Sequence, residues 1–442
     1  MSGSPSPDAE YLDPVALTQR LVRFDTTNPS GNEGECIAHI KSLLDGAGIQ
    51  NQVLAKTPGR PNLNARLPGD GSAAPLLLQG HVDVVSADPS RWQQPPFGGD
   101  IVDGVLWGRS SLDMKGSIAM MLHAIMRAKA DRITPAGDIM LALVCDEESG
   151  GDHGARYMVE ENPELFQGIR YAIGEFGGFS FNLGRQRFYP IMVAEKQVCH
   201  LRVTFKGVGG HASLIQGDNP MADLARLLQQ VQSHNRPTHV TPEARMMFQA
   251  IGRHLSPIAR LGMAALLNSR FTALALKLMG SRGRTFGPLF RNTVNPTIVR
   301  GGDQINVVPG VVSVDLDGRL LPNMPPDRLI SELAVIAGKD ATISRLVRHS
   351  KWPFTGERSG RHPCAHAHAC GDGWKAICPP WHPNLRFLPM LLPSTLDFAA
   401  VIHGPDERAA VDAINFGADA VYRLLQRYGR TPWLGVGMPY FV

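Results

Sequence analysis

The chain has 442 residues, of which 43% are hydrophobic and 19% charged, as in a globular protein with two domains or one domain with a large insertion. Its net charge of +4, from 44 basic and 40 acidic residues, is too small and too scattered to indicate binding to nucleic acid or to a membrane surface. The polar N-terminus, the lack of a long apolar run and the six cysteines indicate a soluble, cytoplasmic protein without a disulfide framework.

The first part of the chain predicts an α/β domain. Apolar residues recur at helical spacing on both sides of a polar turn between residues 14 and 47, which indicates two helices. Short continuous apolar runs then alternate with helical patterns, as in a mostly parallel sheet covered by helices on both faces. The expected strands are residues 75–79, 138–145 and 171–173, and the expected helices are residues 116–130 and 154–162.

A different pattern begins near Val198. Residues 199–208 alternate with the period of a half-exposed strand. The elements expected after it complete the order strand-helix-strand-strand-helix-strand, which is typical of a ferredoxin-like sandwich. They are residues 220–233, 297–300, 311–320, 326–337 and 341–347, with a largely helical insertion at about residues 243–291.

These patterns predict two domains, one inserted into the other. Residues 1–197 and 350–442 form the larger domain, with a mixed, mostly parallel sheet flanked by helices and a final helix over residues 409–425. Residues 198–349 form the inserted α+β domain. We expect the inserted domain to act as a lid and to mediate homodimerisation through its helix or its sheet edge.

The sharpest chemical signal is the pair His81 and Asp83, directly after the first buried strand. The carboxyl ends of such strands border the crevice where open α/β sheets bind ligands, and the i, i+2 spacing puts both side chains on one side of the backbone. His81 is then suited to ligate a metal while Asp83 holds its other ring nitrogen. Taken alone, the pair would more often be part of a surface loop.

Further acidic residues repeat this placement. Asp113 lies in a loop that leads into a predicted helix. Glu147, Glu148 and Glu175 follow the next two predicted strands. Carboxylates gathered at one place repel one another unless a cation neutralises them, so the repetition indicates a metal site.

Four motifs carry a family resemblance: GHVDVV, GRSSLDMKG, DEESGG and GGHAS, in this order. With them the chain resembles the zinc-dependent family of acetylornithine and succinyl-diaminopimelate deacylases, glutamate carboxypeptidases, dipeptidases and aminoacylases. The resemblance extends over nearly the whole chain, from FDTTNPSG at residues 24–31 to the final predicted helix. It implies a two-metal hydrolase with an inserted lid domain.

The resemblance also implies a ligand set. By motif, His81 and Glu175 bind one metal ion, Glu148 and His403 bind the other, and Asp113 bridges the two. Mixed imidazole and carboxylate ligands suit Zn²⁺, with Co²⁺ or Mn²⁺ as substitutes. We therefore expect two zinc ions per chain.

Two further residues have implied catalytic roles. Glu147 is the adjacent carboxylate that points away from the metals, takes a proton from the bridging water and passes it to the leaving nitrogen. His211, in the GGHAS motif, reaches the active site in the family, usually from the partner subunit, and donates to the developing oxyanion. The alternative for His211 is a cap of the helical region that follows.

Asn306 in INVVPG and Arg319 in DGRLLP match positions where the family binds the backbone and the carboxylate of its substrate. Arginine suits this task because its fork matches a carboxylate bidentately. A turn cap and a charge at a strand edge explain the two residues nearly as well. The expected substrate is a small peptide or N-acyl amino acid with a free carboxylate.

The resemblance fails between about residues 357 and 386. The family has a glycine-rich Gly-Thr-Asp or Gly-Ser-Asp loop here, whereas this segment holds three of the six cysteines and four histidines. An additional metal site, a divergent loop and a reading-frame slip are three interpretations. We favour the slip, because the family pattern resumes abruptly at residue 387 and leaves His403 usable.

Three functions remain open at this point. We favour a carboxypeptidase or dipeptidase, because the helical insertion enlarges the lid beyond the compact form of the biosynthetic deacylases. A biosynthetic-type N-acyl amino acid deacylase or a carbamoyl-amide hydrolase would use the same site. A catalytically impaired homologue is the third hypothesis, because the segment at 357–386 would alter the substrate pocket.

Overall fold

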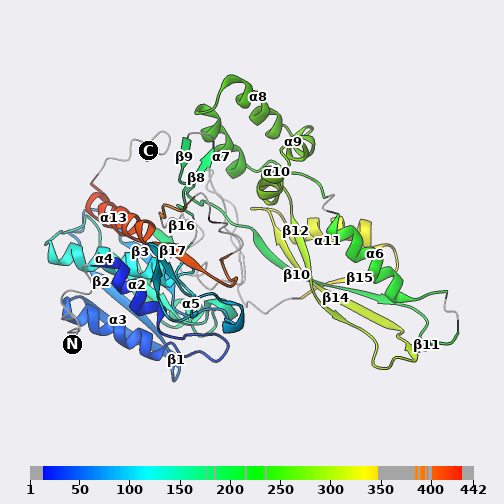
Figure 1. The fold of residues 1–442 in the computed structure, drawn as a ribbon, viewed down its shortest axis with the longest axis horizontal. Coiled ribbons are helices and arrows are strands. Elements are labelled where there is room, and N and C mark those ends of the chain that lie inside the picture. Colours follow the sequence, from blue (N-terminus) through cyan, green and yellow to red (C-terminus); the bar gives the residue numbers. More distant parts are fainter. Residues whose placement is uncertain are drawn as a thin grey trace. The chain divides into compact units, whose positions relative to one another are not determined.

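The computed structural model describes residues 13–175, 177–183, 186–214, 217–233, 236–346, 384–386, 389–393, 396 and 401–430. The chain divides into two compact units, Met1–Val193 with Gly371–Val442 (unit 1) and Ala194–Cys370 (unit 2), whose elements are labelled in Figure 1. The unusual segment at 357–386 lies outside the described residues except for 384–386. The three interpretations of this segment therefore remain predictions. The roles predicted for the two domains also remain predictions.

Unit 1 is built on a six-stranded sheet with the order β1-β2-β6-β3-β7-β16. Its strands are β1 (Gln50–Thr57), β2 (Arg60–Leu67), β3 (Leu76–His81), β6 (Ile139–Val144), β7 (Tyr171–Gly174) and β16 (Asn384–Arg386). The last four run parallel, while β1 and β2 form an antiparallel hairpin beside β6. The three strands predicted from apolar runs are confirmed. The hairpin was not predicted, because β1 is mostly exposed and has no such run.

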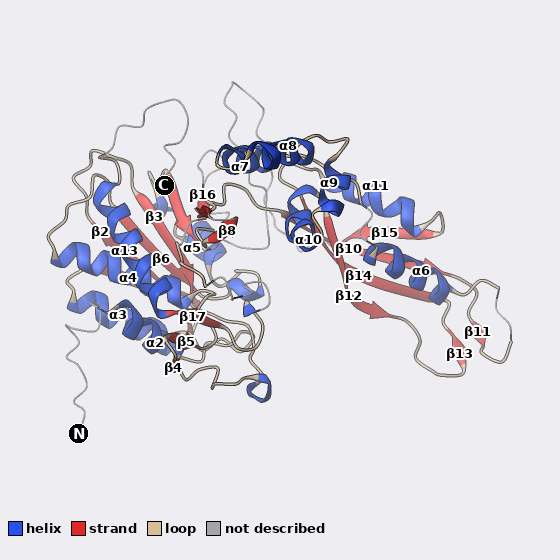
Figure 2. Ribbon diagram, turned by 45° about the horizontal axis from the view of Figure 1, so that its top comes forward, coloured by secondary structure: helices blue, strands red, loops and turns tan. Residues whose placement is uncertain are grey.

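Helices cover both faces of this sheet, as expected for buried parallel strands. Successive residues of β3 point to opposite faces of the sheet. Leu78 packs in the cluster that includes α3 and α4, whereas Leu77 packs in the cluster that includes α5. In Figures 1 and 2, α4 and α13 lie side by side over the sheet. The helices are α2 (Pro14–Val22), α3 (Gly34–Gly46), α4 (Lys115–Ala130), α5 (Ala155–Glu161) and α13 (Val411–Arg427).

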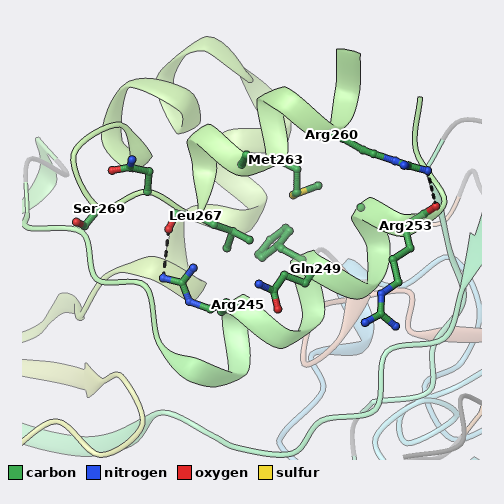
Figure 3. Close-up of a pocket in the computed structure, with 11 residues that line it drawn as sticks. Arg245, Gln249, Arg253, Arg260, Met263, Leu267 and Ser269 are labelled. Atoms are coloured by element: carbon green, nitrogen blue, oxygen red, sulfur yellow. Dashed lines mark hydrogen bonds between the residues drawn. The ribbon is translucent and has the colours of Figure 1, made fainter. Parts of the chain in front are cut away.

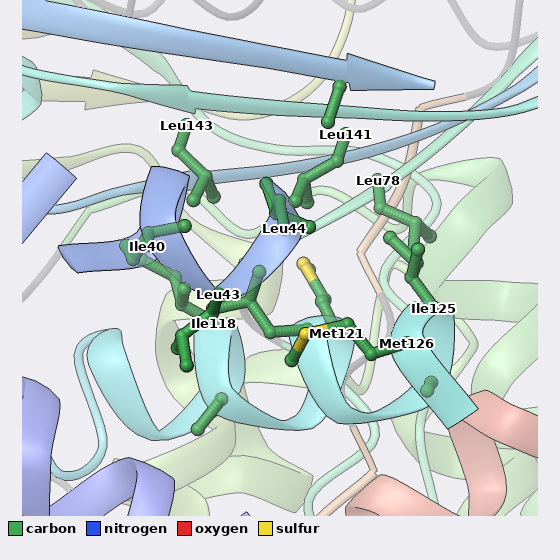
Figure 4. Packing of buried hydrophobic residues seen from close by; sticks show 14 of the residues in the cluster. Ile40, Leu43, Leu44, Leu78, Ile118, Met121, Ile125, Met126, Leu141 and Leu143 are labelled. Atoms are coloured by element: carbon green, nitrogen blue, oxygen red, sulfur yellow. The ribbon is translucent and has the colours of Figure 1, made fainter. Parts of the chain in front are cut away.

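Helix α4 is the centre of the unit 1 core. Its side chains Ile118, Met121 and Ile125 meet those of α3 and of the strands, as Figure 4 shows. Since α4 begins just after Asp113, its packing fixes the loop that carries this residue. The remaining strands are β4 (Ile101–Val102), β5 (Val105–Trp107) and β17 (Arg408–Ala410), which form one small sheet, and β8 (Phe181–Leu183) and β9 (Gln186–Phe188), which form a hairpin.

Unit 2 contains a four-stranded antiparallel sheet with the order β12-β14-β10-β15. Together with α6 and α11 it has the predicted ferredoxin-like order. The strands are β10 (Gln197–Lys206), β12 (Thr293–Arg300), β14 (Val311–Leu320) and β15 (Ala341–Arg345), and the helices are α6 (Pro220–Gln232) and α11 (Pro326–Ala337). Alternate residues of β10, such as Leu201 and Val203, are buried in one cluster with Leu227 of α6 and Leu329 of α11.

The predicted helical insertion consists of α7 (Pro242–Arg253), α8 (Pro257–Leu266), α9 (Thr272–Leu278) and α10 (Ser281–Phe286). The first two have well-formed starts, because the hydroxyls of Thr241 and Ser256 accept backbone N–H groups and a proline follows each. Two short strands, β11 (Gly210–His211) and β13 (Val307–Val308), form a separate ladder. Across the described residues, no helix has the length and apolar character needed to cross a bilayer.

Candidate metal centre

His81 ends the fully buried strand β3 and is itself only 1% exposed. Its Nδ1 lies 2.9 Å from the backbone carbonyl oxygen of Asp83 and 3.5 Å from Asp83 Oδ1. A carbonyl oxygen only accepts hydrogen bonds, so Nδ1 carries the proton and donates it. With this proton on Nδ1, the ring can present the lone pair of Nε2 to a metal ion.

Asp83 holds its neighbours in a way that the sequence did not indicate. The shorter contact to His81 is through its backbone, while its carboxylate accepts the N–H groups of Glu147 at 3.1 Å and Glu148 at 3.0 Å. Asn28 donates to the same carboxylate at 2.9 Å. Burial alone would raise the pKa of Asp83, but His81, Asn28 and the Glu148 N–H lower it. Asp83 therefore stays ionised and positions the turn that carries both glutamates.

Asp113 lies between two imidazoles. Its Oδ1 is 3.2 Å from His81 Nε2, and its Oδ2 is 3.0 Å from His403 Nε2. The residue is only 4% exposed, whereas the His403 side chain is half exposed. One carboxylate thus offers a separate oxygen to each histidine, which is the geometry of a bridging ligand.

Glu175 and Glu148 complete the two sides of this arrangement. Glu175 Oε2 lies 3.5 Å from His81 Nε2, and Glu148 Oε1 lies 3.1 Å from His403 Nε2. Two groups result, in each of which the ligand atoms lie within 4.8 Å of one another: one of His81, Asp113 and Glu175, and one of Asp113, Glu148 and His403. All five predicted ligands come together, and Asp113 belongs to both groups.

Glu147 lies at the same place. A third group joins an oxygen of Glu147 to ligand atoms of His81 and Glu148, again within 4.8 Å. The carboxylate therefore lies beside ligand atoms from both halves of the site and does not point away from them, contrary to what the family resemblance had implied. A carboxylate at this position lies within reach of a group held among these ligand atoms.

The charges of the site fit metal ions. Burial alone would lower the pKa of His81, but hydrogen bonds with Asp113, Asp83 and Glu175 raise it well above the ordinary value. Hydrogen bonds with Asp113 and Glu148 raise the pKa of His403 to about 10. The surrounding carboxylates thus favour a positive charge at both imidazole rings, whether from a proton or from a metal ion. The same nitrogen and oxygen donors are those that Zn²⁺ prefers, so these residues fit two cations that share Asp113.

Two buried residues to which the sequence gave no role connect the loops of the site. Glu407 is fully buried, and its Oε2 lies 2.5 Å from Nη1 of Arg109. Its Oε1 accepts the N–H groups of Leu112 at 2.8 Å and Asp113 at 3.0 Å. Arg109 Nη2 donates to the carbonyl oxygens of His403 at 3.3 Å and of the next residue at 3.0 Å. The Arg109–Glu407 pair thereby ties the Asp113 loop to the His403 loop.

The other predicted site residues belong to unit 2. His211 is exposed on β11, and its Nδ1 lies 2.7 Å from Ser213 Oγ. The N–H group of Ala212 donates to the carbonyl oxygen of Asn306 at 2.9 Å, so the structure brings His211 and Asn306 together. Arg319 lies apart from them on β14 and binds Asp317 through two hydrogen bonds of 2.9 and 3.0 Å. The roles predicted for these three residues remain predictions.

Comparison with known proteins gives a consistent picture. Residues 77–270 match the sequence model of Peptidase family M20/M25/M40. The succinyl-diaminopimelate desuccinylase of Cereibacter sphaeroides is 32% identical over 232 residues, which are 51% of this chain and 57% of the relative. Probable carboxypeptidase S-like 2 of Dictyostelium discoideum is 26% identical over 299 residues, 63% of this chain and 54% of the relative. The chain thus spans about half the length of these curated relatives.

A solved structure shows the same fold over almost the whole chain. The M20 family metallo-carboxypeptidase from Sulfolobus solfataricus aligns with a TM-score of 0.62 at 17% sequence identity. The alignment covers 95% of this chain and 99% of that protein. The predicted fold class, a mixed sheet flanked by helices with an inserted α+β domain, is confirmed.

Proposed function

We propose that the chain is a member of the peptidase family M20/M25/M40, whose sequence model residues 77–270 match, and that it is a hydrolase that uses two metal ions to cleave an amide bond. The observation that carries the proposal is Asp113, whose two oxygens face His81 and His403. The proposed ligands are His81, Asp113, Glu148, Glu175 and His403. Zinc is the proposed metal, with Co²⁺ or Mn²⁺ as substitutes, because the donors are imidazole nitrogens and carboxylate oxygens.

Metal ions bound in such a site polarise the scissile carbonyl and bring the pKa of a bound water towards about 7. The chain supplies the proton transfer. Glu147 accepts the proton of the attacking water on a carboxylate oxygen and then donates it to the leaving nitrogen. Asp83 supports this role, because its carboxylate fixes the Glu147 backbone in the turn and its carbonyl oxygen fixes the His81 ring.

We assign substrate binding to unit 2. His211 donates to the developing oxyanion from the partner subunit of a homodimer, Asn306 binds the substrate backbone, and Arg319 binds its free carboxylate. The support is the juxtaposition of exposed His211 with Asn306, whose carbonyl oxygen accepts the N–H group of Ala212. Arg319 must exchange or share its Asp317 partner to bind a carboxylate, so it is the weakest of the three assignments.

The favoured substrates are small peptides, with carboxypeptidase or dipeptidase activity. The long helical insertion of unit 2 supports this choice, as does the name of the Dictyostelium discoideum relative. An N-acyl amino acid deacylase is the second candidate, favoured by the 32% identical desuccinylase, and a carbamoyl-amide hydrolase would use the same groups. We place the reaction in the cytoplasm, since the three described cysteines, Cys36, Cys145 and Cys199, are buried free thiols.

The experiment combines metal analysis with a substrate panel. We expect about two zinc ions per chain after dialysis against zinc, and hydrolysis within a panel of dipeptides, N-acetylornithine, N-succinyl-diaminopimelate and N-acyl amino acids. The Glu147→Ala variant should keep its metal and lose about 100- to 10,000-fold in kcat. Full turnover by this variant would contradict the proposed base. Two bound ions without hydrolysis of any substrate would identify a non-catalytic homologue, and absence of metal would remove the proposal.

A further inference from the structure

The helical insertion of unit 2 concentrates positive charge. Residues 242–286, which span α7 to α10, contain seven basic residues and one acidic residue, a net charge of +6 in a chain whose total is +4. Averaged over the sequence, this surplus looked scattered. In the structure the exposed basic side chains of the insertion are Arg245, Arg253, Arg260, Arg270, Lys277 and Arg284.

The same insertion exposes apolar side chains at helical spacing. On α8, Ile258 and Leu261 are 86% and 74% exposed, while Leu266 is the buried residue of that helix. On α9, Leu274 and Leu278 continue a stripe that begins at Phe271, with the i, i+3, i+7 spacing of one helix face. Each stripe lies away from the residues that its helix buries. Figure 1 shows α10 beside the sheet of unit 2 and α8 on the side of the insertion away from it.

Three of the arginines surround a cavity of about 680 Å³ between α7 and α8. Phe248, Met263 and Leu267 give it an apolar lining, as Figure 3 shows in part. Arg260 donates to the carbonyl oxygens of Arg253 at 2.9 Å and Leu255 at 3.0 Å, and Arg245 donates to that of Leu267 at 3.3 Å. Because these acceptors are neutral, the guanidinium charges remain. A cavity with an apolar lining and a cationic rim suits the headgroup region of an anionic amphiphile.

We propose that residues 242–286 form a peripheral docking surface for a membrane that contains anionic phospholipid. Exposed aliphatic and phenylalanine side chains enter the interface between headgroups and acyl chains, while the surrounding arginines and lysine bind the negative surface. The proposal does not depend on the hydrolase function, since none of its residues belongs to the metal centre.

Charge and chemistry favour a membrane over other occupants. A symmetric contact with a second copy of this surface would place a charge of +6 against another of +6, which like-charge repulsion opposes. A nucleic acid would match the charge, but the stripes are mainly aliphatic, whereas binding to single strands relies on aromatic stacking. An anionic bilayer satisfies both the positive charge and the apolar stripes.

The test is sedimentation of the full-length protein with vesicles. We expect no binding to pure phosphatidylcholine, and binding to vesicles with about 30% phosphatidylglycerol that weakens as salt rises. Arg270→Glu with Lys277→Glu should lower the partition coefficient at least about 20-fold, because each basic residue near such a surface contributes about five-fold. Leu274→Ser with Leu278→Ser should lower it about ten-fold.

Two single-substitution controls make changes of the same kind at exposed positions of unit 2 outside the insertion. Val335→Ser replaces a side chain that is 84% exposed on α11, and Lys206→Glu reverses a charge at the end of β10. Both should bind vesicles like the unchanged protein, and all variants should unfold at the same temperature because the residues are exposed. The proposal is overturned if anionic vesicles are not bound, or if the controls and the insertion variants bind alike. It is also overturned if the insertion variants instead abolish a dimer or the binding of nucleic acid.

Discussion

Each unit has a cluster of buried or half-buried groups of like charge, and the two clusters have opposite signs and behave differently. At the strand ends of unit 1 the buried groups include the carboxylates of Asp113 and Glu148, which lie beside two imidazoles. Burial alone would raise the pKa of Asp113, but these imidazoles hold it well below its usual range. In unit 2 a half-buried cluster of basic side chains surrounds Lys196, the residue before β10. Burial and the neighbours Arg236 and Arg319 lower the pKa of Lys196 to about 7.

The difference explains why one cluster indicates a ligand and the other does not. A lysine can relieve the cost of burial by releasing its proton, and Lys196 then keeps contacts to the carbonyl oxygen of Arg291 at 2.6 Å and to Thr293 Oγ1 at 3.2 Å. A carboxylate could likewise become neutral by taking up a proton, but the two imidazoles hold the pKa of Asp113 low, so this cluster keeps its charge. Four predictions test this comparison, from the largest expected effect to the smallest.

Asp113→Asn should have the largest effect, because it removes the carboxylate whose two oxygens face His81 and His403 separately. We expect metal content to fall below two ions per chain and hydrolysis to fall at least about 100-fold. Metal analysis after dialysis and the steady-state rate measure the two effects. Asp152→Asn, at an exposed position outside the cluster, serves as the control and should change neither. Unchanged metal content in the Asp113 variant would show that this carboxylate does not hold a metal ion.

Glu407→Gln should weaken the tie between the Asp113 and His403 loops. The change leaves Arg109 as a buried cation without its carboxylate, so unfolding should require about 3–5 kcal/mol less. Metal affinity of the folded protein should fall about 10- to 100-fold, since the pair positions ligands without binding metal itself. Competition with a chelator measures the affinity, and denaturant unfolding measures the stability.

A matched control distinguishes this positioning role from general stability. Lys41→Ala breaks an exposed pair with Asp45 in the same unit and should cost less than about 1 kcal/mol without changing metal affinity. If Glu407→Gln lowers stability while the folded protein keeps its full metal affinity, the Arg109–Glu407 pair is structural only.

Lys196 predicts that unit 2 becomes more stable in alkaline solution. The pKa of this lysine is about 7 in the folded chain and 10.5 ordinarily, so between these values the unfolded chain binds more protons. Stability should therefore rise by roughly 3 kcal/mol from pH 7 to pH 10. Denaturant unfolding at several pH values measures the rise, and Lys196→Met should remove it. A flat profile in the unchanged protein would show that Lys196 is not buried as a neutral amine.

Asp315 predicts the smallest effect, in the acid range, where stability again rises with pH. Hydrogen bonds from Arg202 and Arg300 lower the pKa of this carboxyl to about 2, so its contribution is present above pH 4 and is lost as pH falls towards 2. The expected loss is about 1 kcal/mol, because both arginines are partly exposed and salt screens them. Asp315→Asn should remove this acid-dependent part of the unfolding free energy, and an unaltered acid transition in this variant would contradict it.

The sequence indicated most of the residues that meet in the candidate metal centre because its cues are local. A continuous apolar run marks a buried strand, and the next residues then lie at the carboxyl edge of the sheet, whatever the rest of the chain does. This placement located His81 and the glutamates, and the family resemblance added His403. In the same way, the order of half-exposed strands and amphipathic helices predicted the ferredoxin-like sheet of unit 2.

Only the tertiary structure decided how distant segments meet. Arg109 and Glu407 are 298 residues apart, and no local pattern in either motif shows that one faces the other. The role of the Asp83 carboxylate as an acceptor for the Glu147 and Glu148 N–H groups likewise arises from packing between β3 and the turn after β6. The charge of the insertion became meaningful only once folding placed six basic side chains on its surface. Periodicity records which face of an element is buried, whereas contacts between loops are fixed by the packing of whole elements, which one sequence does not encode in any short window.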